Sequence, residues 1–214
     1  MHICQKRGKE MKYALLPKAM WAVFAPSFKR ELHLITDDAP QKIMTGAHKK
    51  YKEILSSIPE FDKDDRFIVN ILSAAMLASV YLGLSKKPTL DAMTEYYERA
   101  SDNFIMRRHL KNSNQFTEKY QQKLKMSAEK SRSRNNPYSW IFDYVPGKNI
   151  ESFTANFYTC GICQLMNTLG IGEIIPAMCR YDYTMAKMSG TIFTREQTLA
   201  SGGSCCDCHY KKGV

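Results

Sequence analysis

The stretch FIVNILSAAMLASVYLGL, residues 67–84, contains no charged side chain. Its length lies at the lower limit for a membrane span. Asn70, Ser73 and Gly83 dilute the apolar run, however, and charged residues flank both ends without the asymmetry that orients a membrane helix. We therefore expect this segment to be the buried central helix of a helical bundle, ended near Gly83 and by Pro88.

Apolar residues at helical spacing predict further helices on both sides of this segment. Pro26 is expected to end or kink the first of them, because proline lacks the N–H that a helix interior uses. Thr89 is placed to cap the helix that follows the central one. The predicted helices are residues 11–35, a segment from Pro40 to Pro59, residues 90–110 and residues 116–132.

The polar run from Ser131 to Pro137 is the clearest internal boundary. It divides the chain into a helical subdomain, residues 1–135, and a cysteine-rich subdomain, residues 136–214. Beyond it the periodicity changes to two, which predicts strands. The expected order is a hairpin, two short helices and two further strands: 140–145, 153–158, 160–169, 173–188, 191–200 and 204–211. The predicted fold class is α+β, with a helical bundle packed on a small antiparallel sheet.

The charge balance is basic, with 31 Lys and Arg against 21 Asp and Glu and a net charge of +10. Such a balance favours small anionic substrates, and we expect most of it to be solvated surface. The aromatic and basic pattern of a nucleic-acid module is missing, so no specific nucleic-acid partner is expected. No membrane association is expected either, and a homo-oligomer is left open.

The chain has seven cysteines, an odd number, and its first ten residues lack the apolar core of a secretory signal. A cytoplasmic location is therefore expected, where cysteines serve as thiols, metal ligands or nucleophiles. Six of the seven lie between Cys160 and His209. Cys160 and Cys163 form a Cys-x-x-Cys at the start of a predicted helix, whose dipole favours a thiolate. The alternative is that one thiol packs in the core and the other has no role.

Cys179 and Asp182 lie three residues apart and so share one helix face. A thiol beside a carboxylate suits thiol chemistry coupled to proton transfer, or two metal ligands. Arg195, with Thr198 nearby on the same predicted strand, could grip a substrate carboxylate. The competing interpretation is an exposed arginine paired with Glu196.

Gly202 and Gly203 allow either close approach to a ligand or a tight hairpin. In the strand that follows, Cys206 shares a face with Cys208, whereas Asp207 and His209 lie on the opposite face with Cys205. The cysteine cluster is therefore not by itself a metal centre. A soft metal such as Zn²⁺ would need a wider set, for which Cys179, Asp182, Cys206 and His209 are the candidates.

Taken together, these motifs resemble the L-2-amino-thiazoline-4-carboxylic acid hydrolase family. The resemblance rests on Cys160-x-x-Cys163, on Pro176-x-x-Cys179-x-x-Asp182-Tyr183, and on Arg195-x-x-Thr198 followed by Gly202-Gly203-x-x-Cys206-Asp207. One departure is Cys208, which stands where the family usually has an aromatic residue.

The resemblance implies a hydrolase acting on carbon–nitrogen bonds of a small cyclic amidine carboxylate, opening a thiazoline ring to N-carbamoyl-cysteine. A thiolate would attack the amidine carbon while an acid protonates a departing nitrogen, and no cofactor is needed. The nucleophile would be Cys179 or Cys206, with Cys160 as a third candidate. Asp182 would be the acid and base, and Arg195 the anchor. Two non-enzymatic alternatives stay open: a small-ligand or zinc-binding module, and an interaction protein with buried cysteines.

Overall fold

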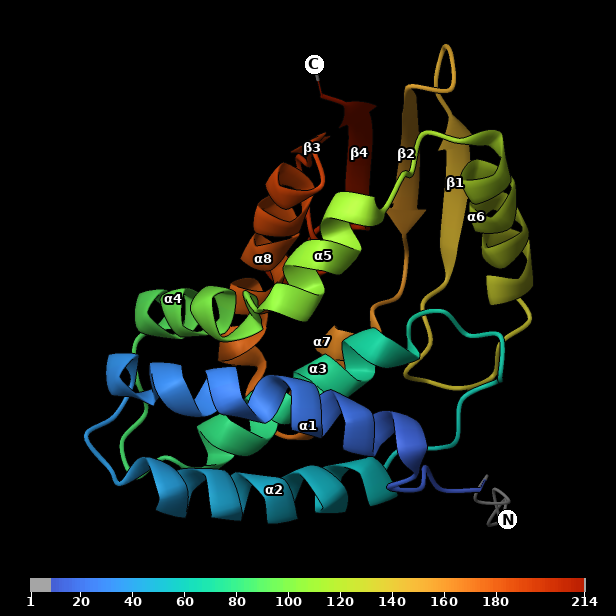
Figure 1. The fold of residues 1–214 in the computed structure, drawn as a ribbon. Helices are drawn as coiled ribbons and strands as arrows, with labels where there is room; N and C mark the ends of the chain where they lie inside the picture. Colours follow the sequence, from blue (N-terminus) through green and yellow to red (C-terminus); the bar gives the residue numbers. More distant parts are fainter. Residues whose placement is uncertain (1–8, 214) are drawn as a thin grey trace, which may run out of the picture.

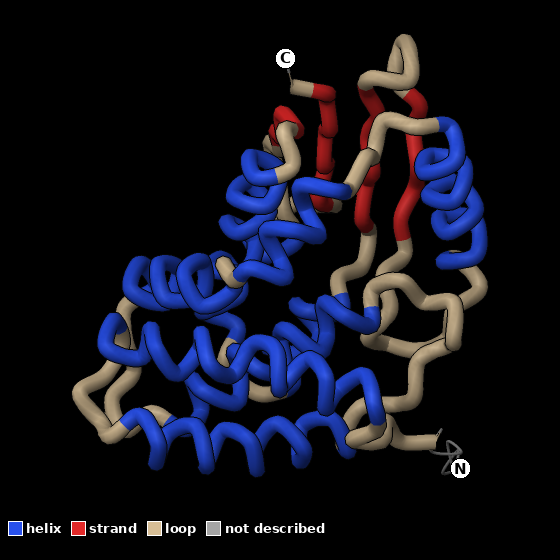
Figure 2. The backbone as a smooth tube through the Cα atoms, viewed as in Figure 1, coloured by secondary structure: helices blue, strands red, loops and turns tan. Residues whose placement is uncertain are grey.

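Two layers make up the fold, a group of helices and a four-stranded sheet (Figures 1 and 2). The computed structural model describes residues 9–213, so most of the segment searched for a secretory signal lies outside the described residues. The helices are α1 (Leu15–Arg30), α2 (Pro40–Ser56), α3 (Ile68–Gly83), α4 (Leu90–Ser101), α5 (Phe104–Asn112), α6 (Glu118–Ser131), α7 (Gly161–Thr168) and α8 (Ile175–Met188). The strands are β1 (Phe142–Pro146), β2 (Ser152–Phe157), β3 (Thr191–Thr194) and β4 (Cys206–Lys212), and short 3₁₀ turns are η1 (Glu31–Leu34), η2 (Gly172–Ile174) and η3 (Leu199–Ser201). The α+β class is confirmed.

Helix α3 is the central element, as its sequence predicts. Every residue from Ile71 to Tyr81 except Ser73 is buried, and α3 packs against α1, α2 and α7. Its alanines, such as Ala74 and Ala78, let these neighbours approach closely. Within residues 9–213, no helix combines the length and the apolar composition that crossing a membrane requires.

Helix α1 runs through Pro26 to Arg30, so this proline does not end the helix, and the alternative of a kink stays a prediction. Packing explains why, since Phe24, Ser27 and Phe28 on either side of Pro26 are buried. The Ser27 hydroxyl donates to the carbonyl oxygens of Phe24 and of Ala100 in α4, which ties this part of α1 to the core.

The single helix predicted for residues 90–110 is in fact two. Thr89 caps α4 as expected, its Oγ1 accepting a hydrogen bond from the Ala92 N–H. The chain then turns at Asp102, and Asn103 starts α5 by accepting a hydrogen bond from the Met106 N–H at 2.9 Å. The break arises because an asparagine side chain satisfies the first N–H groups of a new helix better than it continues an old one. Helix α5 contains no buried residue.

The sheet is antiparallel with strand order β1-β2-β4-β3. Its register places the aromatic side chains and the thiols of the strands on one face, which α6 and α8 cover: Phe142, Tyr144, Phe153, Phe157, Phe193, Cys206, Cys208 and Tyr210. The opposite face carries polar residues that include Thr154, Asp207 and His209. The predicted hairpin and the two faces of β4 are confirmed. The strand predicted for 191–200 is too long, because β3 ends at Thr194 and a loop follows.

One hydrophobic core spans both segments of the chain. It joins residues of α1 to α4, such as Phe28 and Tyr96, with Trp140 and with residues of α7 and α8, such as Leu165 and Met178. The division at residue 135 remains a prediction. What the shared core shows is that α7 and α8 are held directly by the helical bundle.

Candidate active site

A group of thiols gathers where α7, α8 and β4 meet. Cys160 is the residue before α7, Cys163 lies in its first turn, and Cys179 lies on α8. Cys206 and Cys208 come from the covered face of β4. These thiols are close enough to influence one another's ionisation. The structure thus brings together Cys160, Cys179 and Cys206, as the sequence predicts, and adds Cys163 and Cys208.

The Cys160 and Cys163 thiols influence each other's ionisation. The neighbouring Cys160 thiol lowers the pKa of Cys163, although burial and the nearby Cys179 and Cys206 thiols oppose this. The neighbouring Cys163 thiol, together with burial, raises the pKa of Cys160 well above its usual value. When two acidic groups lie close together, ionisation of one raises the pKa of the other, so only one of them ionises readily. Cys163, in the first turn of α7, is therefore the thiolate of the pair.

The remaining thiols of the cluster ionise less readily. Burial raises the pKa of Cys179 to about 12, and the carboxylate of Asp182 adds to this effect. Burial also raises the pKa of Cys208 to about 12 and that of Cys206 by less. The N–H of Leu199 donates to the Cys206 sulfur at 3.3 Å, which partly offsets the burial. Neither of the two cysteines favoured from sequence, Cys179 and Cys206, is thus the most acidic thiol.

Asp182 lies beside the thiols and one turn along α8 from Cys179. Burial raises the pKa of the Asp182 carboxyl group to about 6, whereas the positive charge of Arg195 and its hydrogen bond lower this pKa. Its side chain is still 40% exposed. A carboxylate with this pKa changes protonation close to neutral pH, as a general acid or base must.

Arg195 holds Asp182 in place. Its Nη1 donates to Asp182 Oδ2 at 3.0 Å and its Nη2 donates to the Cys179 carbonyl oxygen at 2.8 Å. Only 6% of the arginine side chain is exposed. An exposed pair with Glu196 therefore does not describe Arg195. In this arrangement Arg195 positions Asp182, and its role as a substrate anchor stays a prediction.

Thr198, Gly202 and Gly203 shape the loop between β3 and β4. The Thr198 side chain caps η3 by accepting from the Ser201 N–H, and Gly202 closes η3 with a φ of 84°. A Cβ on Gly203 would lie 2.9 Å from the Thr198 carbonyl oxygen and from the Gln197 side chain. Their role is thus to fold the loop that brings the Leu199 N–H to Cys206.

Asp207 and His209 lie on the other face of β4, away from the thiols. Asp207 accepts hydrogen bonds from the Gln197 N–H at 2.8 Å and the Glu196 N–H at 3.2 Å, so it fastens the same loop from outside. His209 contacts Thr154 and Asp207. Because His209 faces away from Cys206, the four candidate zinc ligands do not converge. Among residues 9–213, no three His, Cys, Asp or Glu side chains are arranged to hold a metal ion.

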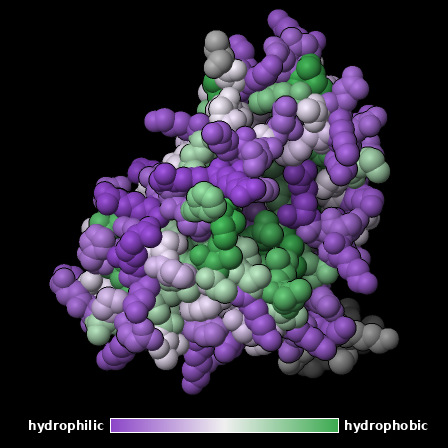
Figure 3. Space-filling view, viewed as in Figure 1, coloured by the Kyte–Doolittle hydropathy of each residue, from purple (hydrophilic) through white to green (hydrophobic). Residues whose placement is uncertain are grey.

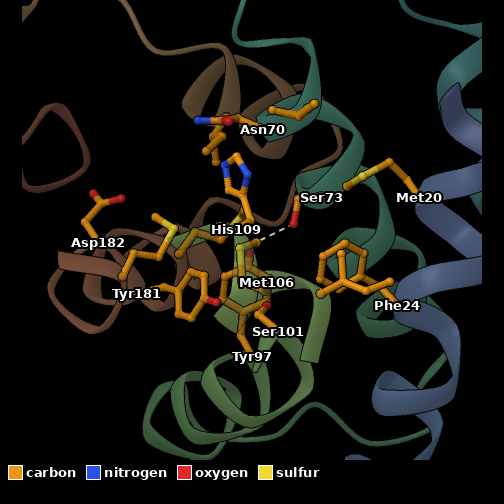
Figure 4. A pocket seen from close by; sticks show the side chains of 15 residues that line it. Met20, Phe24, Asn70, Ser73, Tyr97, Ser101, Met106, His109, Tyr181 and Asp182 are labelled. Atoms are coloured by element: carbon orange, nitrogen blue, oxygen red, sulfur yellow. Dashed lines mark hydrogen bonds between the residues drawn. The ribbon is translucent and has the colours of Figure 1, made fainter. Parts of the chain in front are cut away.

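A cavity of about 260 Å³ borders Asp182 (Figure 4). Its walls come from α1, α3, α4, α5, α7 and α8, and Asp182 lies at one edge of the group of side chains that line it. The sequence patterns did not predict this cavity, and His109 is one of its lining residues. A signal was present on α8, where Met178, Tyr181, Asp182 and Met185 follow helical spacing. Glu173, by contrast, precedes α8 and accepts a hydrogen bond from the Tyr81 hydroxyl.

A ligand-sized cavity bordered by a carboxylate of raised pKa is typical of an enzyme site. The model of one family, L-2-amino-thiazoline-4-carboxylic acid hydrolase, matches residues 69–210, which is more than half of the chain. The chain belongs to this family of hydrolases. The match begins in α3 and ends in β4, and so includes all of the elements that carry the thiols. No curated protein and no solved structure is significantly similar to the chain.

Proposed function

We propose that this chain hydrolyses small cyclic amidines that bear a carboxylate, with Cys163 as nucleophile and Asp182 as general base. The observation that carries the proposal is the pairing of two opposite pKa shifts in one site. Cys163 is the cysteine of the cluster whose pKa is lowered, and Asp182 has a pKa of about 6. The lowered pKa favours the thiolate form of Cys163, and Asp182 can accept a proton above about pH 6.

In the first step, the Cys163 thiolate adds to C2 of the protonated amidine. For the aminothiazoline ring, both nitrogens stay on this carbon in N-carbamoyl-cysteine, so the bond that breaks is C2–S and not a carbon–nitrogen bond. The departing nitrogen expected from sequence is therefore wrong for this substrate. The ring sulfur leaves with the bonding electron pair, and C2 becomes an isothiouronium on Cys163.

In the second step, water attacks the same carbon and Asp182 takes one of its protons. The C2–S bond to Cys163 then breaks, which restores the thiolate and leaves the carbamoyl group. This step releases two protons: one neutralises the ring thiolate and the other passes to solvent. Arg195 supports the step by keeping Asp182 in place and by limiting the rise of its pKa.

The test is an assay with 2-amino-thiazoline-4-carboxylate that follows two products at once. Ring opening releases one free thiol per turnover, whereas loss of the exocyclic nitrogen releases ammonia and leaves the ring closed. We expect thiol release, and mass spectrometry of the quenched reaction should find the carbon of the substrate attached to Cys163.

Cys163→Ser should lower kcat by at least about a hundredfold, because a hydroxyl is a far weaker nucleophile at this pH. Cys205→Ser is the matched control, since Cys205 is also partly exposed but lies outside the cluster. Full activity of Cys163→Ser, or an adduct on another cysteine, would contradict the assignment of the nucleophile. Failure to hydrolyse any cyclic amidine would contradict the proposed function.

A further inference from the structure

The cavity beside Asp182 is mainly apolar and has no charged anchor for a carboxylate. Its walls include the methionines Met20, Met106, Met178 and Met185 and the ring of Phe24. No Lys or Arg is among the described residues that line it. A charged carboxylate would lose its hydration there without gaining a partner.

Two hydroxyl groups in the wall lack hydrogen-bond partners among the described residues. They are Ser101 Oγ, at the end of α4, and Tyr181 OH, on α8. Ser101 is 2% exposed and Tyr181 3% exposed. The neighbouring Ser73 and Tyr97 hydroxyls, by contrast, bond each other at 2.9 Å (Figure 4). An unpaired buried hydroxyl destabilises the fold, because it has lost its hydrogen bonds to water without gaining others. A ligand with one polar group would remove this cost.

The cavity reaches the proposed general base. Asp182 forms part of its wall together with Ile162 of α7 and Met178 of α8, and no cysteine is among the described residues that line it. A molecule in the cavity would therefore extend to the carboxylate of Asp182, which lies one turn along α8 from Cys179.

The volume of the cavity exceeds what the amidine and carboxylate part of a small substrate requires. About 260 Å³ equals the liquid volume of about nine water molecules. Two of the apolar residues that line the cavity, Val69 and Ile105, are exposed. Figure 3 shows an apolar area near the centre of one face of the molecule. Methionines and aromatic rings adapt well to flat apolar groups.

We infer that this cavity binds an apolar ring that carries one hydrogen-bonding group, and that the ring is an arm of the natural substrate. The second half of the inference rests on the proposed hydrolysis. The arm would lie against the methionines, its polar group would bond Ser101 or Tyr181, and the amidine and carboxylate would stay at the Asp182 end. The substrate class is then a cyclic amidine with an aryl or similar substituent.

The test uses p-cresol as the probe, a ring with one hydroxyl group, and calorimetry on the full chain. We expect p-cresol to bind wild type and Cys163→Ser with equal affinity, and more tightly than toluene. Ser101→Ala should reduce the preference for p-cresol over toluene. Ile105→Trp should weaken binding at least about tenfold by filling the mouth, since residue 105 is 56% exposed and tolerates a larger side chain. Ile192→Trp, at a 47% exposed position on β3, is the matched control.

No binding of p-cresol at millimolar concentration, or equal weakening in both tryptophan variants, would overturn the binding site. If p-cresol binds but does not compete with hydrolysis of an amidine by wild type, the cavity does not hold part of the substrate, although it remains a binding site. If wild type hydrolyses no cyclic amidine while p-cresol still binds Cys163→Ser, the proposed function is contradicted and the binding site remains supported.

Discussion

Arg195 joins Asp182 to the main chain of Cys179, with its Nη1 on the carboxylate and its Nη2 on the carbonyl oxygen. The link connects the loop after β3 to the middle of α8. It also opposes the effect of burial on the carboxylate, so Arg195 decides how far the pKa of Asp182 rises. Position and ionisation of Asp182 therefore depend on one side chain.

Arg195→Ala should move the acidic limb of the kcat/KM profile to higher pH. In the wild type, activity should fall as the pH drops through about 6, because Asp182 becomes protonated and stops accepting protons. Without Arg195 the pKa of Asp182 rises further, so activity is lost at a higher pH when the pH is lowered. The same variant should lose about 2 kcal/mol of stability, the usual worth of hydrogen bonds to a charged group. Arg180→Ala, on an exposed face of α8, should leave the limb in place.

Cys163 should be the first cysteine that iodoacetamide alkylates, with Cys179 and Cys208 the slowest of the cluster, since burial raises their pKa to about 12. Peptide mass spectrometry after short exposures at several pH values measures this order. In Cys160→Ala, half-maximal labelling of Cys163 should move to higher pH, because the neighbouring thiol that lowers the pKa of Cys163 is lost. An unchanged labelling curve would show that Cys160 does not activate Cys163.

Gly203→Ala should destabilise the protein by about 1–3 kcal/mol, the cost of overpacking a close contact. The new Cβ would meet the Thr198 carbonyl oxygen and the Gln197 side chain at 2.9 Å. Gly46→Ala is the contrasting variant, since nothing lies within 4 Å of a Cβ there and α2 should gain stability. Urea unfolding of both variants measures the difference. Equal stability of the two would contradict the packing of this loop.

Asp207→Ala should cost about 1–2 kcal/mol at pH 7 by releasing the loop before β4. Burial acts against ionisation of Asp207, but hydrogen bonds from the Gln197 and Glu196 N–H groups prevail and lower its pKa. The carboxylate therefore stabilises the fold above its usual pKa, and this contribution disappears as the pH falls through the lowered value. Wild type and variant should become equal in stability in acid. His209→Ala should show little loss at either pH, which urea titrations at pH 7 and pH 3 can check.

The fold was largely predictable because its patterns are local. The uncharged run at 67–84 gave the central helix, and the alternation around Phe142, Phe153 and Cys206 gave the strands and their faces. Pro26 and the break at Asn103 were not predictable in the same way. At Pro26, buried contacts from other helices outweigh the loss of one N–H group. At Asn103, a single capping side chain outweighs a continuous helical pattern.

The site was predictable in its membership but not in its roles. Spacing alone places Cys179 beside Asp182 and puts Cys206 on the inner face of its strand. Which thiol ionises, however, depends on the mutual influence of Cys160 and Cys163 and on burial by distant segments. The contacts of Arg195 were not predictable for the same reason, because its partners lie on a helix that the strand pattern does not reveal. The cavity draws on six helices, and no short stretch of sequence contains it.

The separation of rings and thiols on one sheet face from Asp207 and His209 on the other also disfavours misfolded pairings of the strands. A slip of β4 by one residue against β2 would exchange every side chain between the faces. Asp207 and His209 would then face the rings of Phe153 and Phe157, with no water to solvate them, and the thiols would face solvent. A misaligned strand is thus penalised at several positions at once. Asp207 and His209, which take no part in the proposed chemistry, therefore help to select the strand register that places Cys206 among the other thiols.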